Sequence, residues 1–157
     1  MHVAKSWEVV QHVDAPIDTV WELLADGRGW KTWARFARSE LVAEGIPAPD
    51  GVGARRAFGS GPFGSVEEVV VFDPPQHFAY ELRSGMPIVG YRADVHLTTD
   101  TTDTADTRGT TITWKSAFEK SKVPGGDGFY AWFLRFFVRD TAKRLAAAAE
   151  RRAASSP

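Results

Sequence analysis

Charged residues on two neighbouring predicted strands are the best candidates for acid–base chemistry. Glu67 shares a strand face with Val69 and Val71, which would carry its carboxylate into an apolar interior beside Arg56 or Arg55 of the preceding strand. Burial without a partner raises the pKa of a carboxyl group toward neutrality, and that shift produces a general acid or base. A surface ion pair between the two strands accounts for the same residues without catalysis. The sequence leaves both interpretations open.

The glycine-rich stretch from Gly59 to Gly64 fits the spacing G-x-G-x-x-G of a phosphate-binding loop. Such a loop binds phosphate where it opens a helix, because the free amides at the helix N-terminus face the anion. Here Pro62 removes one amide donor, and a predicted strand follows instead of a helix. We therefore interpret the stretch as a hairpin loop that could gate a ligand pocket.

Other polar patterns indicate no site. Asp94 and His96 share a strand face, but two ligands without a third make a poor metal site, so we expect a solvated outer face there. Residues 99–108 lack the glycine and the spacing of a calcium loop and fit a solvated hairpin tip. Ser60 and Ser65 have no nearby histidine to activate them as nucleophiles. We predict no metal ion and no cofactor.

Length and composition are those of an ordinary globular domain. The chain has 157 residues, of which 43% are apolar and 25% charged, and we predict one domain over residues 1–157. A net charge of −1 gives no reason to expect nucleic acid as a partner, and the absence of cysteine excludes disulfides. No secretory signal is visible, and the longest aromatic run is too short to span a bilayer. We expect a cytoplasmic protein without stable membrane insertion.

Alternating apolar and polar residues predict seven strands, and three- and four-residue spacing predicts the helices. The strands cover residues 6–13, 39–44, 53–58, 66–72, 77–83, 91–98 and 110–118. A helix begins with Pro16 at its first position, and a second short helix surrounds Trp30 and Trp33. A long final helix covers residues 128–153, with Asp127 as its N-cap.

The final helix carries more aromatic residues than one sheet-facing stripe requires. The stripe consists of Tyr130, Leu134, Phe137, Thr141, Leu145 and Ala148, and the surplus rings are Phe129, Trp132, Phe133 and Phe136. These rings could widen the apolar face, line the mouth of a cavity or meet a second subunit. Membrane docking is less favoured, because basic residues do not cluster around them.

Four stretches together resemble a known family. They are the strand–helix–helix opening from Ser6 to Trp33, the segment Gly53–Arg56, the segment Val66–Glu81, and the strand that begins at Gly109. In this order they resemble the START-like, or SRPBCC, helix-grip superfamily and, within it, the polyketide cyclase/dehydratase-like branch. The resemblance implies an α+β fold in which a curved antiparallel seven-stranded sheet wraps around a long C-terminal helix, with two short helices between strands 1 and 2. It also implies an internal cavity, because the curved sheet does not fill the space beside the helix.

Strand alternation and this resemblance together predict ten ligand-binding residues. They are Trp33, Arg56, Glu67, Phe78, Tyr80, Tyr91, Trp114, Ser116, Phe129 and Phe133. We expect Leu82, Ala93 and Val95 to face the interior beside them. Ordinary core packing accounts for several of these positions without a ligand. A buried phenol or indole, however, needs a polar partner, and a ligand can supply one.

Three functions remain open. The first is binding, with or without transport, of a small hydrophobic or aromatic ligand such as a polyketide or lipid. The second is a polyketide aromatase/cyclase or dehydratase, in which Glu67 or Tyr80 would move protons and Arg56 would hold an enolate or carboxylate. The third is an interaction module or homodimer that uses Trp132 and Phe136 of the last helix.

Overall fold

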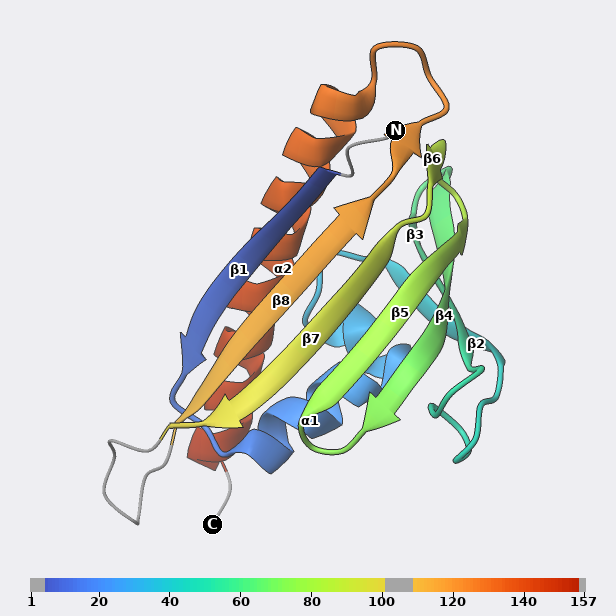
Figure 1. The fold of residues 1–157 in the computed structure, drawn as a ribbon. Helices are drawn as coiled ribbons and strands as arrows, with labels where there is room; N and C mark the ends of the chain where they lie inside the picture. The colour runs from blue at the N-terminus through green and yellow to red at the C-terminus, as the bar shows by residue number, and fades with distance from the viewer. Residues whose placement is uncertain (1–4, 101–108, 156–157) are drawn as a thin grey trace.

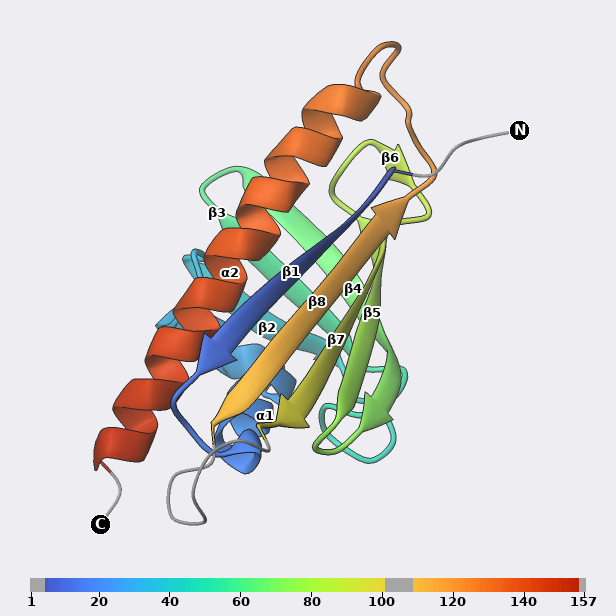
Figure 2. The same ribbon diagram turned by 60° about the vertical axis from the view of Figure 1, so that its left-hand side comes forward.

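Seven strands form one antiparallel sheet, and the long helix α2 lies across one of its faces (Figures 1 and 2). The computed structural model describes residues 5–100 and 109–155, so most of the predicted hairpin tip at residues 99–108 lies outside the described residues. The strands pair in the order β1-β8-β7-β5-β4-β3-β2. Their bounds are β1 Lys5–Val13, β2 Arg38–Ala43, β3 Arg55–Ser60, β4 Phe63–Asp73, β5 His77–Ser84, β7 Arg92–Thr99 and β8 Thr110–Phe118. This is the predicted helix-grip fold.

Alternation along the strands decides which side chains enter the interior. In β8, Trp114 and Ser116 are buried on either side of the exposed Lys115. In β7, Ala93 and Val95 are buried on either side of the half-buried Asp94. The predicted inner faces of these two strands are confirmed.

The alternation breaks in β4 at a β-bulge between Val69 and Val71. A bulge inserts one extra residue into a strand, so the residues beyond it change faces. Phe72 therefore pairs with the buried Phe78, with 6.3 Å between the ring centroids, and Val71 faces outward. The prediction that Val71 shares the inner face of Glu67 is wrong for this reason.

Two short helices connect β1 to β2, as predicted (Figure 1). Helix α1 covers Ile17–Ala25, and the 3₁₀ helix η1 covers Gly27–Thr32. Pro16 immediately precedes α1 in an extended conformation, one position earlier than predicted. The indole N–H of Trp30 donates a hydrogen bond to the carbonyl of Leu24 at 2.9 Å. This bond fixes η1 against the end of α1.

Helix α2 covers Asp127–Ser155 and packs against β1, β8 and α1. Its buried residues are Leu134, Val138, Thr141, Ala142, Leu145, Ala146, Ala148 and Ala149. These side chains bury one side of the helix over most of its length. Within the described ranges, no helix is long and apolar enough to cross a membrane.

The start of α2 differs from the prediction. Asp127 is the first helical residue, and its carboxylate accepts a hydrogen bond from the backbone N–H of Ser121 at 2.7 Å instead of capping the helix. Ser121 belongs to a two-stranded sheet of β6 (Ile88–Val89) and β9 (Lys120–Ser121) that the sequence did not predict. Strands of two residues are too short to show alternation. This sheet and the Asp127 contact tie the segment before β7 to the start of α2.

Candidate functional site

The most unusual feature of the interior is a fully buried arginine. Arg56 has 0% exposure, and its guanidinium carbon lies close to the centroids of four aromatic rings. The distances are 4.7 Å to Trp30, 4.8 Å to Phe78, 5.2 Å to Phe58 and 5.7 Å to Tyr80. A cation within about 6 Å of a ring face is attracted by the ring quadrupole. The rings therefore form an aromatic cage that holds one positive charge.

The hydrogen-bonding capacity of Arg56 is largely unused within the described residues. Its Nη1 donates to the carbonyl of Leu24 at 3.5 Å, whereas Nε and Nη2 have no acceptor within hydrogen-bond distance. The nearest carboxylate is that of Glu67, whose Oε1 lies 3.8 Å from Nη2 and has no hydrogen-bond partner either. Buried polar atoms without partners are rare in native proteins. They make this pair the strongest candidate for contact with a ligand.

Glu67 combines burial with an unusual affinity for protons. Its side chain is 13% exposed, and burial raises the pKa of its carboxyl group to about 7, although the nearby Arg56 acts in the opposite direction. Burial also lowers the pKa of Arg56, which still stays protonated at neutral pH because a guanidinium starts from so high a value. Glu67 can therefore gain or lose a proton near neutrality, as a general acid or base must.

Gly27 makes room for the Arg56 side chain. A Cβ atom at this position would lie 2.5 Å from Cδ and 3.2 Å from Cγ of Arg56. The first of these distances is far below a normal van der Waals contact, so any larger residue would displace the arginine stem. Gly27 is also held in place, since its backbone N–H donates to a carboxylate oxygen of Asp50 at 3.2 Å. The start of η1 thus forms one wall of the cage.

Two tyrosines extend the polar interior toward β8. The hydroxyl of Tyr91 donates to Oγ of Ser116 at 3.5 Å, and the Tyr80 ring lies edge-on to Trp114 at 6.5 Å between centroids. Burial raises the pKa of Tyr80 well above its usual value and also raises that of Tyr91. Both phenols therefore keep their protons at neutral pH, so they can donate hydrogen bonds but cannot act as bases.

The structure brings eight of the ten predicted ligand-binding residues into the interior or its edge. They are Trp33, Arg56, Glu67, Phe78, Tyr80, Tyr91, Trp114 and Ser116. Arg56 and Glu67 both point inward. Of the two interpretations that the sequence left open, the structure therefore supports the interior pair and not the surface ion pair. The sequence reasoning missed two members of the aromatic cage, Trp30 and Phe58. The only sequence signal for Trp30 was its place in the Trp-bearing second helix.

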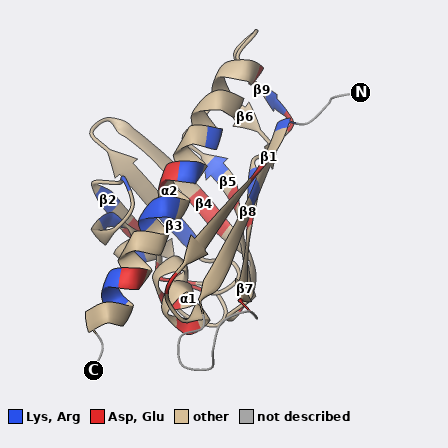
Figure 3. Ribbon diagram, turned by 90° about the vertical axis from the view of Figure 1, so that its left-hand side faces the viewer, with Lys and Arg blue, Asp and Glu red and all other residues tan. Residues whose placement is uncertain are grey.

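The other two predicted residues lie on the surface of α2. Phe129 is 58% exposed and Phe133 39% exposed, and Trp132 and Phe136 beside them are exposed as well. The Phe129 ring contacts those of Trp132 and Phe133 rather than the aromatic cage. Figure 3 shows basic segments spread along α2 rather than gathered at one end. A ligand contact for Phe129 and Phe133 stays a prediction.

The surface of the part of the chain that the structure describes includes two hollows. One, of about 380 Å³, is lined by Ser6, Trp7, Glu8, Arg92, Asp94, Lys115, Ser116 and Ala117. The other, of about 200 Å³, is lined by Arg38, Glu40, Ala57, Phe58, Gly64, Ser65, Val66 and Ser84. Neither is lined by Arg56 or Glu67, and neither is the enclosed cavity that the sequence predicted. The glycine-rich stretch forms the tight β3–β4 hairpin and no helix, as predicted.

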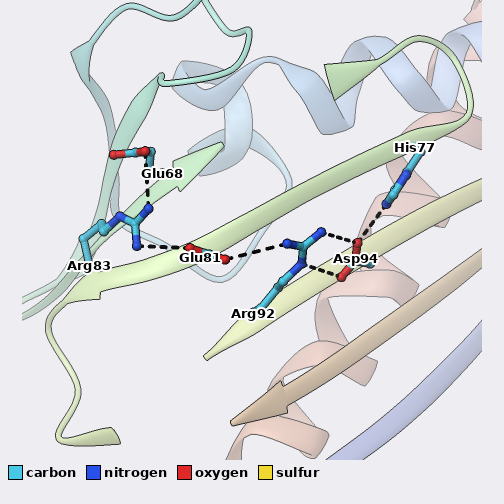
Figure 4. Close-up of polar contacts among 6 residues, drawn as sticks. All are labelled: Glu68, His77, Glu81, Arg83, Arg92 and Asp94. Carbon is cyan, nitrogen blue, oxygen red and sulfur yellow. Dashed lines mark hydrogen bonds and ion pairs between the residues drawn. The ribbon is translucent and has the colours of Figure 1, made fainter. Parts of the chain in front are cut away.

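The outer face of the same strands carries paired charges. Figure 4 shows these ion pairs running across β4, β5 and β7. Each residue of this network pairs with the next in the order Glu68, Arg83, Glu81, Arg92, Asp94 and His77. Asp94 and His96 lie on this face, as the sequence predicted. The sheet therefore separates a paired, hydrated charge network from a single buried and incompletely paired charge.

The sequence profile of the family described as polyketide cyclase/dehydrase and lipid transport matches residues 5–150. The chain belongs to this family. A search of curated proteins by sequence gives no match.

Several solved structures share the fold. Norcoclaurine synthase from Thalictrum is 13% identical with a TM-score of 0.71, and the alignment covers 97% of this chain and 98% of that one. The di-domain ARO/CYC BexL from the BE-7585A biosynthetic pathway is 14% identical with a TM-score of 0.72, covering 98% and 51%. XoxI from Bacillus cereus is 15% identical with a TM-score of 0.70, covering 91% and 94%. At identities this low, the likeness shows the helix-grip fold and leaves the activity of this chain to its own residues.

Proposed function

We propose that the protein binds a small hydrophobic or aromatic molecule, such as a polyketide or lipid, in its interior beside Arg56. The observation that carries this proposal is the buried guanidinium, which four rings surround and which has no acceptor among the described residues for two of its nitrogens. A carbonyl, enolate or carboxylate oxygen of a ligand would satisfy these donors, and the rings would contact its apolar body. Because Arg56 is fully buried, binding has to move rings apart.

The test uses two neighbouring arginines as a matched pair. Arg56→Met removes the buried cation, and Arg55→Met removes an exposed one from the same strand. We expect thermal stabilisation and native-mass complexes with a fatty acid, a sterol or an aromatic polyketide in the wild type and in Arg55→Met. Arg56→Met should lose most of this binding. The double variant Arg56→Met with Glu67→Gln is the folding control, because it does not leave the Glu67 carboxylate buried without a cation. Failure of all three ligand classes to bind the wild type, or equal binding by both single variants, would contradict the proposal.

A polyketide cyclase or dehydratase is the second candidate, because the pKa of Glu67 is raised to about 7 beside a cation. In such a reaction Glu67 would remove a proton from the carbon between two ketones, and Arg56 would bind the resulting enolate oxygen. That carbon then attacks a second carbonyl of the same chain, and Glu67 returns the proton to the new alkoxide. Tyr80 serves as a hydrogen-bond donor in this scheme. A linear poly-β-ketone substrate that cyclises no faster with wild type than with Glu67→Gln would exclude it.

Self-association through α2 is supported by the exposed rings of Phe129, Trp132, Phe133 and Phe136. Sedimentation velocity of the wild type and of Trp132→Ala tests it, since an interface built on these rings would weaken in the variant. A monomer at every concentration in both proteins would count against it.

We also propose that the protein is cytoplasmic and that residues 1–157 form one domain.

A further inference from the structure

A second cluster of chemically capable side chains lies on the opposite face of the sheet from Arg56. It consists of His77 on β5 and of Asp94 and His96 on β7. His77 and His96 are direct cross-strand partners, and Asp94 is two residues before His96, so all three share the outer face. One ligand atom from each residue lies within 4.8 Å of the other two. None of these residues takes part in the proposed ligand site.

We propose that His77, Asp94 and His96 bind one divalent transition metal ion of the zinc type. Two imidazoles and one carboxylate are a donor set that zinc accepts in sites with three protein ligands, where water takes the fourth position. Nitrogen donors also favour zinc, cobalt and nickel over calcium and magnesium. The sequence alone showed only the two ligands of β7, because the third becomes adjacent only through the β5–β7 register.

His77 and Asp94 are in direct hydrogen-bond contact, which is closer than two ligands of a bound ion. Nε2 of His77 lies 2.8 Å from Oδ1 of Asp94. Two ligands on a tetrahedral zinc ion, each at about 2.0–2.1 Å, are about 3.3 Å apart. The rings of His77 and His96 lie 4.1 Å apart between centroids and 21° from parallel. Binding of an ion therefore requires the two rings to turn about their χ2 bonds until a nitrogen of each faces the same point beside Asp94.

Neighbouring residues hold the carboxylate ligand in a fixed orientation. Nε and Nη2 of Arg92 donate to the two oxygens of Asp94 at 3.0 and 3.1 Å, as Figure 4 shows. A carboxylate oxygen has two lone pairs, so these bonds leave acceptor positions for an ion. Nη1 of Arg92 also lies 3.7 Å from Oε2 of Glu81, which offsets the repulsion between the guanidinium and a cation. Hydrogen bonds of this kind to a ligating carboxylate are common in metal sites.

The same contacts also describe a simple histidine–aspartate ion pair beside a ring stack, and the experiment distinguishes the two. Untagged protein is titrated with ZnCl2 by calorimetry and with CoCl2 by visible absorption spectroscopy. The key variant is His96→Phe, which keeps a ring against His77 but removes the nitrogen ligand. His12→Ala is the matched control, because His12 also lies 2.8 Å from the carboxylates of Asp14 and Asp100 but is not part of the three-residue cluster.

We expect one zinc ion per chain and a cobalt spectrum typical of four or five ligands. Loss of a residue that only supports a metal ligand costs about 10–100-fold in affinity, so loss of a ligand itself in His96→Phe or His77→Phe should cost at least about a hundredfold. His12→Ala should bind as the wild type does. Circular dichroism of each variant shows whether the sheet is intact. Absence of stoichiometric binding by the wild type, or zinc binding that His96→Phe does not weaken, would overturn the proposal.

Discussion

Two arginine–glutamate pairs, one residue apart on the same two strands, behave in opposite ways. Arg55 pairs with Glu68 on the outer face, with 3.0 Å between Nε and Oε1, and its side chain is 54% exposed. Arg56 lies opposite Glu67 on the inner face, with 3.8 Å between Nη2 and Oε1 and 0% exposure of the arginine. Hydrogen bonds from Arg83 and Arg55 lower the pKa of Glu68, whereas burial raises the pKa of Glu67 to about 7.

The difference shows that solvent, and not residue type, decides what such a pair does. On the outer face water screens both charges, so the pair contributes little to stability and its groups keep ordinary charge states. On the inner face loss of hydration outweighs the attraction between the charges, because the two side chains do not meet at hydrogen-bond distance. The inner pair is therefore poorly suited to stabilising the fold and well suited to binding or proton transfer.

The largest contrast between the two faces should come from core truncation. We expect Trp114→Ala to lower the free energy of unfolding by about 3–5 kcal/mol, because it leaves a large cavity among the interior rings. Lys115→Ala, one residue along on the outer face, should change it by less than about 0.5 kcal/mol. Urea denaturation of both variants measures the difference. A loss below about 1 kcal/mol for Trp114→Ala would show that this interior is not packed as described.

The two glutamates should respond to neutralisation with opposite signs. Folded Glu67 holds its proton more tightly than the unfolded chain does, so its contribution to stability decreases as pH rises from about 4.5 to about 7. Glu67→Gln should therefore be more stable than the wild type at pH 8, by about 3 kcal/mol at most, and similar to it at pH 4. Glu68→Gln should be slightly less stable at pH 8, because the pKa of Glu68 is lowered by its partners.

Urea denaturation at pH 4, 6 and 8 checks this prediction. The difference between wild type and Glu67→Gln should grow between about pH 4 and pH 8 and level off above that range, because folded Glu67 is still half protonated at about pH 7. Equal pH dependence in the two variants would show that the inner pair is as hydrated as the outer one.

Two glycine-to-alanine substitutions, one beside the aromatic cage and one far from it, should have opposite effects on stability. Gly27→Ala places a Cβ atom 2.5 Å from Cδ of Arg56, so we expect a loss of about 1–3 kcal/mol and weaker ligand binding. Gly128→Ala in α2 has no atom within 4 Å of the new Cβ and should gain up to about 1 kcal/mol. Thermal unfolding with and without ligand measures both effects. Unchanged ligand affinity in Gly27→Ala would indicate that Arg56 does not contact the ligand.

The smallest effect should come from the outer charge network. Arg83 contacts Glu68 at 3.3 Å and Glu81 at 3.1 Å, and its side chain is 39% exposed. Arg83→Met should cost less than about 1 kcal/mol at low ionic strength, and about 1 M NaCl should remove most of the difference by screening. A salt-independent loss would show instead that this network is shielded from solvent.

The architecture could be predicted because strand alternation is strong in most of the sheet. The bounds of β8 agree with the predicted strand, and the inner faces of β7 and β8 follow the alternation. The bulge at Val69 and Val71 could not be predicted, since a period of two gives no sign of an extra residue. The short β6–β9 sheet was missed because its pairing depends on the path of two long connections rather than on local sequence.

The site could be predicted only as a set of candidates. Arg55–Arg56 and Glu67–Glu68 are doublets, so either strand register places one arginine and one glutamate inside, and the alternation alone does not choose between them. Trp30 and Phe58 were missed as cage members because they come from segments that meet only in the folded protein. His77 was missed as a neighbour of Asp94 and His96 for the same reason.

The extra residue in β4 has a consequence for the evolution of strand length in this fold. Glu67 before the bulge and Phe72 after it face the same interior, although five positions separate them and an uninterrupted strand would place them on opposite sides. Deletion of Val70 would restore an unbroken pleat, and the side chain of either Glu67 or Phe72 would then face the solvent. Loss of one residue at this position would therefore force a choice between the buried charge and the aromatic core.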